Sequence, residues 1–255
     1  MMKKTSIMKK TSIMKKDIEL KNSPFGSGPY GGGVYIAAAS ITDVLMRMQA
    51  YSGLRGDIAE IGVLEGAYLR QLYSFLNEKE ICYAIDPYTE LPNLKEKVKL
   101  DFQSRYGLKN QVHFVYESSL DLSLEMFERE GSPGIRFFSI DGNHTENYVL
   151  NDLVLAQKLL INGGIIAVDD YFDRYSPGVS VGMTRYFLEN NNGRLAILIS
   201  GGNKVFLTTK EDYFRYRLLL EKFTNIESVK SCSDIEWFGN PVLFTENILS
   251  DNLPL

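Results

Sequence analysis

The chain has 255 residues, of which 44% are apolar and 12% aromatic, enough for one large hydrophobic core and one main domain. Its formal net charge of −4 is unevenly spread: residues 1–16 hold six lysines and no acid, and the remaining residues carry 22 basic and 32 acidic side chains, a net charge of −10. An acidic body lacks the basic surface with which proteins bind nucleic acids, so a nucleic-acid partner is not expected.

Secretion and membrane insertion are also disfavoured. Cys82 and Cys232 lie far apart in different environments, which argues against a disulfide framework, and no run of about 18 apolar residues occurs. We therefore expect a cytoplasmic protein that does not bind membranes.

The first 55 residues are predicted to lie outside the main domain. Residues 2–13 hold Met-Lys-Lys-Thr-Ser-Ile twice, Met-Lys-Lys follows at 14–16, and there is no apolar run of the kind a signal peptide has. Residues 1–22 are therefore predicted to form a disordered basic tail or to offer alternative start sites, with surface targeting by the lysines as the alternative. Residues 23–55 are predicted to form a glycine-rich loop, either a lid or a plain linker, and then a helix over 34–51. No Gly-Lys-Ser/Thr follows that loop, so it is not a phosphate loop.

From residue 56 to about 224, short apolar runs alternate with amphipathic segments, a pattern typical of a parallel sheet with crossover helices. We expect strands near 57–61, 81–86, 111–115, 135–140, 164–169, 194–200 and 203–209. We expect helices near 66–77, 93–105, 121–130, 145–160 and 179–191, with Asn162-Gly-Gly164 ending the fourth of these. Gly201-Gly202 is too short for a crossover, so the last two strands must be antiparallel. Residues 225–255 are interpreted as an extension that packs on the domain or on a partner subunit.

The first strand leads into a glycine turn, Glu60-x-Gly62-x-x-x-Gly66, just before a helix. A dinucleotide site needs Gly-x-Gly-x-x-Gly, but here Leu64 replaces the second glycine and Glu65 lies where a phosphate would rest. The turn therefore disfavours NAD and favours a ligand with an ammonium group and an adenosine.

Polar residues also follow the second and third strands. Asp86 is positioned to accept hydrogen bonds from two ribose hydroxyls, or else to cap the segment before Pro87. Ser118 and Ser119 are candidates for contact with an adenine edge, with capping of the next helix as the alternative.

Three acids end two further strands: Asp141 follows one, and Asp169 and Asp170 follow the next. Because like charges repel, such a cluster favours a hard divalent cation with oxygen ligands. The alternative is that these acids only shape turns and caps. His144 adds either a general base beside the ion or a group that orients Asp141.

Together these motifs resemble class I S-adenosylmethionine-dependent methyltransferases over about residues 34–210. The spacing of 28 and 29 residues from Asp141 to the acid pair is similar to that of metal-dependent O-methyltransferases of the catechol type and of the macrocin or noviose sugar type. The resemblance implies an α/β fold with a doubly wound, Rossmann-like sheet of seven mainly parallel strands in the order 3-2-1-4-5-7-6, the last strand antiparallel.

The resemblance also implies roles for individual residues. Cofactor binding falls to Glu60, Gly62, Gly66, Asp86, Ser118, Ser119 and Asp141, magnesium binding to Asp141, Asp169 and Asp170, and catalysis to His144 with Asp141. Asp170 favours the sugar type, because the catechol type usually has an amide at this ligand position. Asn143 departs from the sugar type, which often has at that position an acid that acts as the base. His144 is therefore the candidate base.

The expected function is Mg²⁺-assisted methyl transfer from S-adenosylmethionine to a hydroxyl of a small molecule, a sugar or glycosylated natural product. The alternatives are a catechol-type acceptor, or a non-catalytic adenosine-ligand-binding protein with the same fold. A homodimer is the expected assembly.

Overall fold

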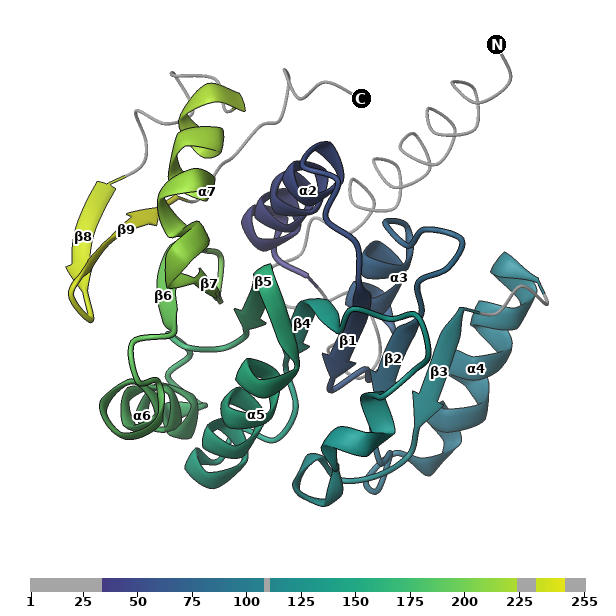
Figure 1. The fold of residues 1–255 in the computed structure, drawn as a ribbon. Coiled ribbons are helices and arrows are strands. Elements are labelled where there is room, and N and C mark those ends of the chain that lie inside the picture. Colours follow the sequence, from purple (N-terminus) through teal and green to yellow (C-terminus); the bar gives the residue numbers. More distant parts are fainter. Residues whose placement is uncertain (1–33, 108–110, 224–232, 246–255) are drawn as a thin grey trace, which may run out of the picture.

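The computed structural model describes residues 34–107, 111–223 and 233–245 (Figure 1). The predicted basic tail, the glycine-rich loop at 23–33 and Cys232 lie outside these residues, as do the first and last parts of the C-terminal extension.

A single mixed sheet forms the centre of the described part. Its strands are β1 (Asp57–Ile61), β2 (Cys82–Ile85), β3 (Val112–Val115), β4 (Ile135–Ile140), β5 (Leu160–Val168), β6 (Leu195–Gly201), β7 (Lys204–Thr209), β8 (Ser233–Trp237) and β9 (Asn240–Phe244). Their spatial order is β3-β2-β1-β4-β5-β7-β6-β9-β8. The first seven positions confirm the predicted order 3-2-1-4-5-7-6.

The strand directions agree with the prediction from the tight turn. β7 is antiparallel to both β5 and β6, while β1 to β5 pair in parallel. The turn between β6 and β7 needs a left-handed residue, which Gly202 supplies with φ of 62°.

Two strands extend the sheet beyond the seven that the resemblance implies. β9 pairs in parallel with β6 through Ile199 and Leu243, and β8 pairs antiparallel with β9. Aromatic side chains fix this hairpin to the domain: the ring centroids of Trp237 and Tyr171 are 4.7 Å apart, and Phe238 stacks on Phe187 at 4.4 Å.

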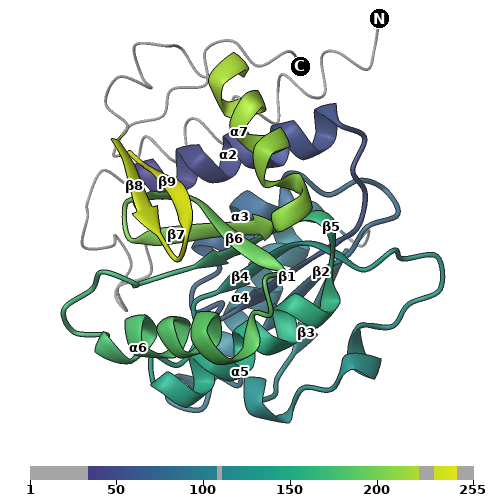
Figure 2. The same cartoon turned by 60° about the vertical axis from the view of Figure 1, so that its left-hand side comes forward.

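Helices cover both faces of the sheet, as Figures 1 and 2 show. They are α2 (Ile36–Tyr51), α3 (Ala67–Tyr73), α4 (Pro92–Tyr106), α5 (Glu146–Leu159), α6 (Pro177–Arg185) and α7 (Lys210–Phe223). α2, α3, α4 and α7 share one core and α5 and α6 the other. Successive strand residues point to opposite cores, Phe137 to the first and Phe138 to the second, which is why these strands are continuously apolar.

The predicted helix over 121–130 is wrong. The chain forms two short 3₁₀ turns there, Ser119–Asp121 and Leu124–Phe127. In the second turn only Phe127 is buried, against Tyr83 and Phe138, so a longer helix would have no apolar face to bury.

Two helix ends also differ from prediction. α5 ends at Leu159 and β5 begins at Leu160, so Asn162-Gly-Gly164 lies inside a strand, where Gly163 adopts φ of 76° and the β4–β5 register is irregular. α3 ends at Tyr73 rather than near 77, whereas α6 (Pro177–Arg185) continues as one π-helical turn over Tyr186–Asn190, so helical structure ends one residue before the predicted 191. Within the described ranges, no helix has the length and apolarity needed to cross a bilayer.

Candidate active site

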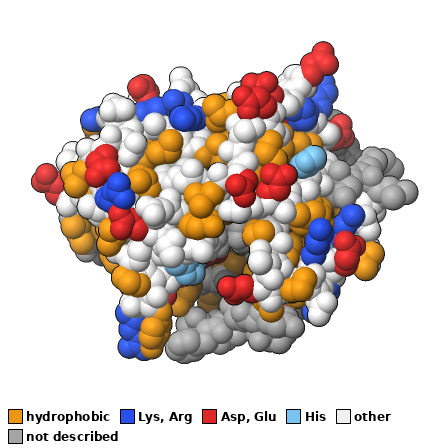
Figure 3. Space-filling view, turned by 90° about the horizontal axis from the view of Figure 1, so that it is seen from below, with side chains coloured by type: hydrophobic (Ala, Val, Ile, Leu, Met, Phe, Trp, Pro, Cys, Tyr) orange, Lys and Arg blue, Asp and Glu red, His pale blue; other side chains and the backbone are white. Residues whose placement is uncertain are grey.

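The candidate site lies where the parallel strands end. Ile61 of β1 pairs with Ile140 of β4, and Ile140 with Val168 of β5, so the residues that follow them become neighbours. The amide of Asp141 donates to the carbonyl of Ile61, and that of Asp169 to the carbonyl of Ile140, both at 2.9 Å. Ligands of open α/β sheets bind at such an edge. The face of the molecule seen in Figure 3 is hollowed, with a histidine and acidic side chains near the hollow.

The glycine turn after β1 packs directly on the end of β4. Gly62 has φ of 86°, and a Cβ built on it would lie 1.8 Å from the carbonyl oxygen of Asp141. Gly66 has φ of 71° and is the N-cap of α3, and a Cβ there would meet Phe102 and Val98 of α4 at 3.1 and 3.3 Å. Gly62 thus permits a close backbone approach beside Asp141, while Gly66 permits the packing of α3 on α4.

Glu60 is buried with part of its hydrogen-bonding capacity unused. Its side chain is 1% exposed, and Oε2 has no hydrogen-bond partner among the described residues. Burial, with a smaller contribution from Asp141, raises the pKa of Glu60 well above its ordinary value. A buried, unpartnered carboxyl is costly unless a ligand completes it, and an ammonium group would do so.

Asp86 binds one backbone amide in the glycine turn after β1 and one in its own loop after β2. Its Oδ2 accepts from the amide of Leu64 at 2.9 Å, and its Oδ1 accepts from the amide of Tyr88 at 2.8 Å. The second contact is the local cap that we considered beside the ribose role. Each oxygen keeps a further lone pair for a ligand.

The two serines after β3 have different surroundings. Ser118 Oγ accepts from the amide of Leu120, which caps the first 3₁₀ turn, as the capping alternative predicted. Ser119 is buried against Asp152 of α5, whose pKa burial raises to about 6. Contact of either serine with adenine stays a prediction.

A lysine that the sequence did not reveal lies between two of the three acids. Lys204 Nζ is 2.7 Å from Asp169 Oδ2 and 3.4 Å from Asp141 Oδ2. Burial works to raise the pKa of Asp141, but the ammonium of Lys204 and the His144 ring outweigh it and lower that pKa. Burial and the charge of Asp141 raise the pKa of Asp169 well above its ordinary value.

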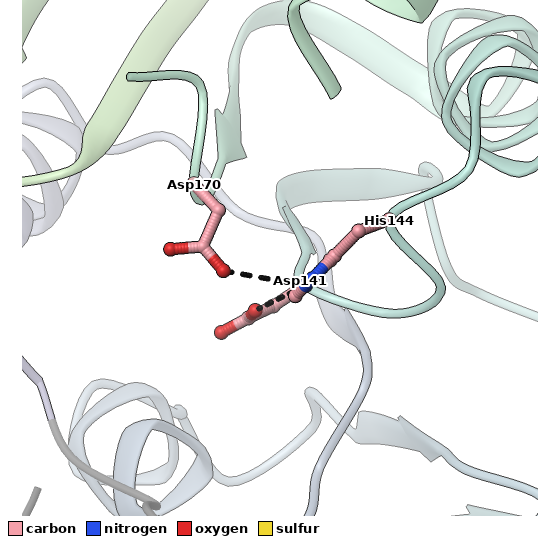
Figure 4. Close-up of side chains that lie close together, drawn as sticks. All are labelled: Asp141, His144 and Asp170. Atoms are coloured by element: carbon pink, nitrogen blue, oxygen red, sulfur yellow. Dashed lines mark ion pairs between the residues drawn. The ribbon is translucent and has the colours of Figure 1, made fainter. Parts of the chain in front are cut away.

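The third acid faces His144 (Figure 4). His144 Nε2 is 3.3 Å from Asp170 Oδ2 and 4.0 Å from Asp141 Oδ1. Asp170 has an unusual φ of 57° for a residue with a side chain, and its Oδ1 accepts from Asn203 Nδ2 at 2.6 Å. Its side chain is thereby aimed at His144.

The group that best fits a metal ion differs in one member from the three predicted ligands. Asp141, His144 and Asp170 each offer a ligand atom within 4.8 Å of the others. Asp169 Oδ1 accepts from the amide of Asp170 and Oδ2 pairs with Lys204. The donor set suits a divalent ion, with Asp169 engaged elsewhere.

The far side of the His144 ring is held by a short chain of hydrogen bonds. Nδ1 is 3.0 Å from Ser176 Oγ, and that hydroxyl donates to Asp173 Oδ2 at 2.8 Å. Because serine has one hydroxyl proton, Nδ1 must be the donor to Ser176, which leaves the lone pair of neutral Nε2 facing the acids. Pairing with Asp141, followed by the charge of Asp170, raises the pKa of His144 despite partial burial.

Residues 59–171 match a family described as "Methyltransferase domain". These residues form a class I S-adenosylmethionine-dependent methyltransferase domain. Every site residue predicted from the sequence lies within the matched range, whereas Asp173, Ser176 and Lys204 lie beyond it. In the sequence, Asp173 and Ser176 lie in an ordinary polar loop, and nothing around Lys204 marks it as a functional residue. The three are recognised only because the fold places them close to His144 and the acids.

Solved structures agree with this methyltransferase fold. The O-methyltransferase NovP superposes with a TM-score of 0.53 at 14% identity, covering 68% of this chain and 80% of NovP. An O-methyltransferase from Bacillus cereus, solved in complex with SAH, gives 0.51 at 17% identity, covering 78% and 88% of the two chains. No curated protein sequence matches the chain. At these identities the likeness concerns the fold alone.

Proposed function

We propose that the protein is an S-adenosylmethionine-dependent O-methyltransferase that acts on a hydroxyl of a small molecule, a sugar or glycosylated natural product. One observation carries the proposal: the unpartnered buried carboxyl of Glu60 lies at the same sheet edge as Asp141, His144 and Asp170. A cofactor ammonium and a hydroxyl acceptor would therefore be brought together. A merely adenosine-binding protein would have no use for a base held as His144 is.

The cofactor supplies an electrophilic methyl group. Glu60 would bind its ammonium, and the glycine turn would let its backbone approach the methionine moiety next to Asp141. Asp86 would accept from the ribose hydroxyls, and Ser118 with Ser119 would border the adenine.

His144 would accept the proton of the acceptor hydroxyl at Nε2, held in position by Ser176. Asp141, Asp169 and Asp170 would hold Mg²⁺, which lowers the pKa of a bound hydroxyl. The donor atoms of Asp141 and Asp170 support this site, and the unused lone pairs of Asp169 would complete it. The acid at 170 supports a sugar-type acceptor over a catechol.

Methyl transfer itself is tested with labelled S-adenosylmethionine and a panel of sugar nucleotides, glycosylated aromatic compounds and catechols. Label on a sugar hydroxyl supports the proposal. Label on catechols alone would assign the chain to the catechol type, and cofactor binding without transfer to any acceptor would favour the non-catalytic alternative.

Glu60→Gln is expected to weaken S-adenosylhomocysteine binding about 10- to 100-fold, since it removes a charge-assisted hydrogen bond worth about 1.5–3 kcal/mol. The raised pKa of Glu60 means that binding an ammonium expels a proton, so wild-type affinity rises with pH and levels off above the pKa of the free protein. Calorimetry at several pH values measures the loss of affinity in Glu60→Gln and the pH dependence of the wild-type affinity, with Glu65→Gln in the same turn as the control. A pH-independent wild-type affinity would contradict this role.

Chelation is expected to lower the rate of methyl transfer about 100-fold, because the acceptor hydroxyl loses its activating ion. Added Mg²⁺ is expected to restore the rate. S-adenosylhomocysteine affinity should change less than about threefold, since Glu60 and Asp86 do not need the ion. Full activity in excess chelator would remove Mg²⁺ from the mechanism while leaving the transferase assignment standing.

A further inference from the structure

Lys204 has an unusual position for a lysine. It begins β7 directly after the tight turn, in a strand buried along its whole length, and is 2% exposed. Moving an ammonium out of water costs several kcal/mol unless charged or polar partners surround it. Such a residue requires an explanation.

The surroundings of its ammonium supply those partners. Nζ lies 2.7 Å from Asp169 Oδ2, 3.4 Å from Asp141 Oδ2 and 4.5 Å from the centre of the Tyr68 ring. Charge-assisted bonds at the first distance are strong, and the ring face adds a cation–π contact. The ammonium therefore lies between the acid ending β4 and the acid ending β5.

Without this cation, the carboxylate of Asp141, which is partly exposed, and that of Asp169, which is largely buried, would repel each other. Asp141 and Asp169 are brought together by the pairing of β4 with β5, which the rest of the sheet enforces. The antiparallel insertion of β7 beside β5 brings the first residue of β7 to the same edge. The strand order of the sheet thus places the ammonium of Lys204 between the carboxylates of Asp141 and Asp169.

We infer that Lys204 is the resident counter-ion of Asp141 and Asp169, a positioning residue that holds both carboxylates at the reacting end without any divalent ion. The inference rests on the proposed function only for what those carboxylates do. A divalent ion then adds to a site that is already neutralised in part, and it would bind the free lone pairs of Asp141, Asp169 and Asp170 while Asp169 also holds the lysine.

The test compares thermal unfolding of full-length Lys204→Met with wild type in excess chelator and in excess Mg²⁺. Methionine keeps the length of the stem and removes the charge. Because the buried carboxylate of Asp169 and the partly exposed carboxylate of Asp141 lose their cation, Tm in chelator is expected to fall by roughly 10 °C. Mg²⁺ should recover a good part of that loss, since it supplies the missing positive charge, and it should raise the wild-type Tm by less, because there Lys204 already neutralises the site in part. Lys158→Met, an exposed lysine of α5, is the matched control.

A double variant tells whether Lys204 acts through its charge or only through its packing, and it also provides the test if Lys204→Met does not fold. Lys204→Met/Asp169→Asn removes the lysine and its closest carboxylate together, so it is expected to be more stable than Lys204→Met alone. Losses that simply add across the two single variants, with no recovery in Mg²⁺, would overturn the inference. These measurements need neither cofactor nor acceptor, so a chain without methyltransferase activity would refute the proposed function and leave the role of Lys204 separately decided.

Discussion

Replacing His144 with alanine is expected to lower turnover by about two to four powers of ten, while the dissociation constant of S-adenosylhomocysteine changes little. The reason is the orientation of the His144 ring. Its Nδ1 is hydrogen-bonded to Ser176, so the lone pair of neutral Nε2 faces the carboxylates of Asp141 and Asp170, where an acceptor hydroxyl would lie. Steady-state kinetics and calorimetry on the same preparations separate the two effects.

The chain offers a matched control in His113, its other histidine, which is exposed on β3. His113→Ala should leave turnover unchanged. The pH profile adds a second readout: because the pKa of His144 is raised, wild-type turnover should fall on the acid side from above the ordinary histidine value, and this limb should vanish in His144→Ala. Turnover unaffected by the alanine would rule out His144 as the base.

Gly62→Ala is expected to destabilise the protein by more than about 4 kcal/mol and to abolish cofactor binding. The new Cβ would lie 1.8 Å from the carbonyl oxygen of Asp141, and the backbone there cannot turn away as a side chain would. β1 and β4 must separate at their ends, which displaces both the glycine turn and Asp141. Urea denaturation measures the stability, and calorimetry the binding.

Gly53→Ala is the control for backbone conformation. Gly53 has φ of 72°, close to that of Gly62, but nothing lies within 4 Å of a Cβ built there. It should therefore show only the cost of a left-handed residue, about 1–2 kcal/mol. Equal losses in the two variants would mean that the approach to Asp141 is not tight.

The strands were predicted well because most are buried on both faces. β1 and β4 have the bounds expected from the sequence, since a strand between two helical layers is a continuous apolar run bounded by polar residues. The same property located the acids: once β4 and β5 are neighbours, Asp141 and Asp170 must lie close together. Segments without such a run were predicted poorly, as the two 3₁₀ turns around Ser119 and Phe127 show.

The C-terminal hairpin illustrates a different limit. β9 pairs with β6, although more than 40 residues separate Ile199 from its partner Leu243. Nothing local in the β9 sequence, Asn-Pro-Val-Leu-Phe, specifies which strand it joins. Contacts of Trp237 and Phe238 with Tyr171 and Phe187 decide its place, and they exist only in the folded protein.

The amino-acid sequence by itself determined the methyltransferase sheet, the glycine turn and the three acids at strand ends, because apolar runs, glycines and terminal acids are local features that act through backbone geometry. Only the tertiary structure decided how the charges are arranged. Lys204 reaches Asp141 and Asp169, and Ser176 reaches His144, across long stretches of chain. Electrostatic and hydrogen-bonding partners depend on distance in space, and the insertion of β7 beside β5 is what sets that distance for Lys204.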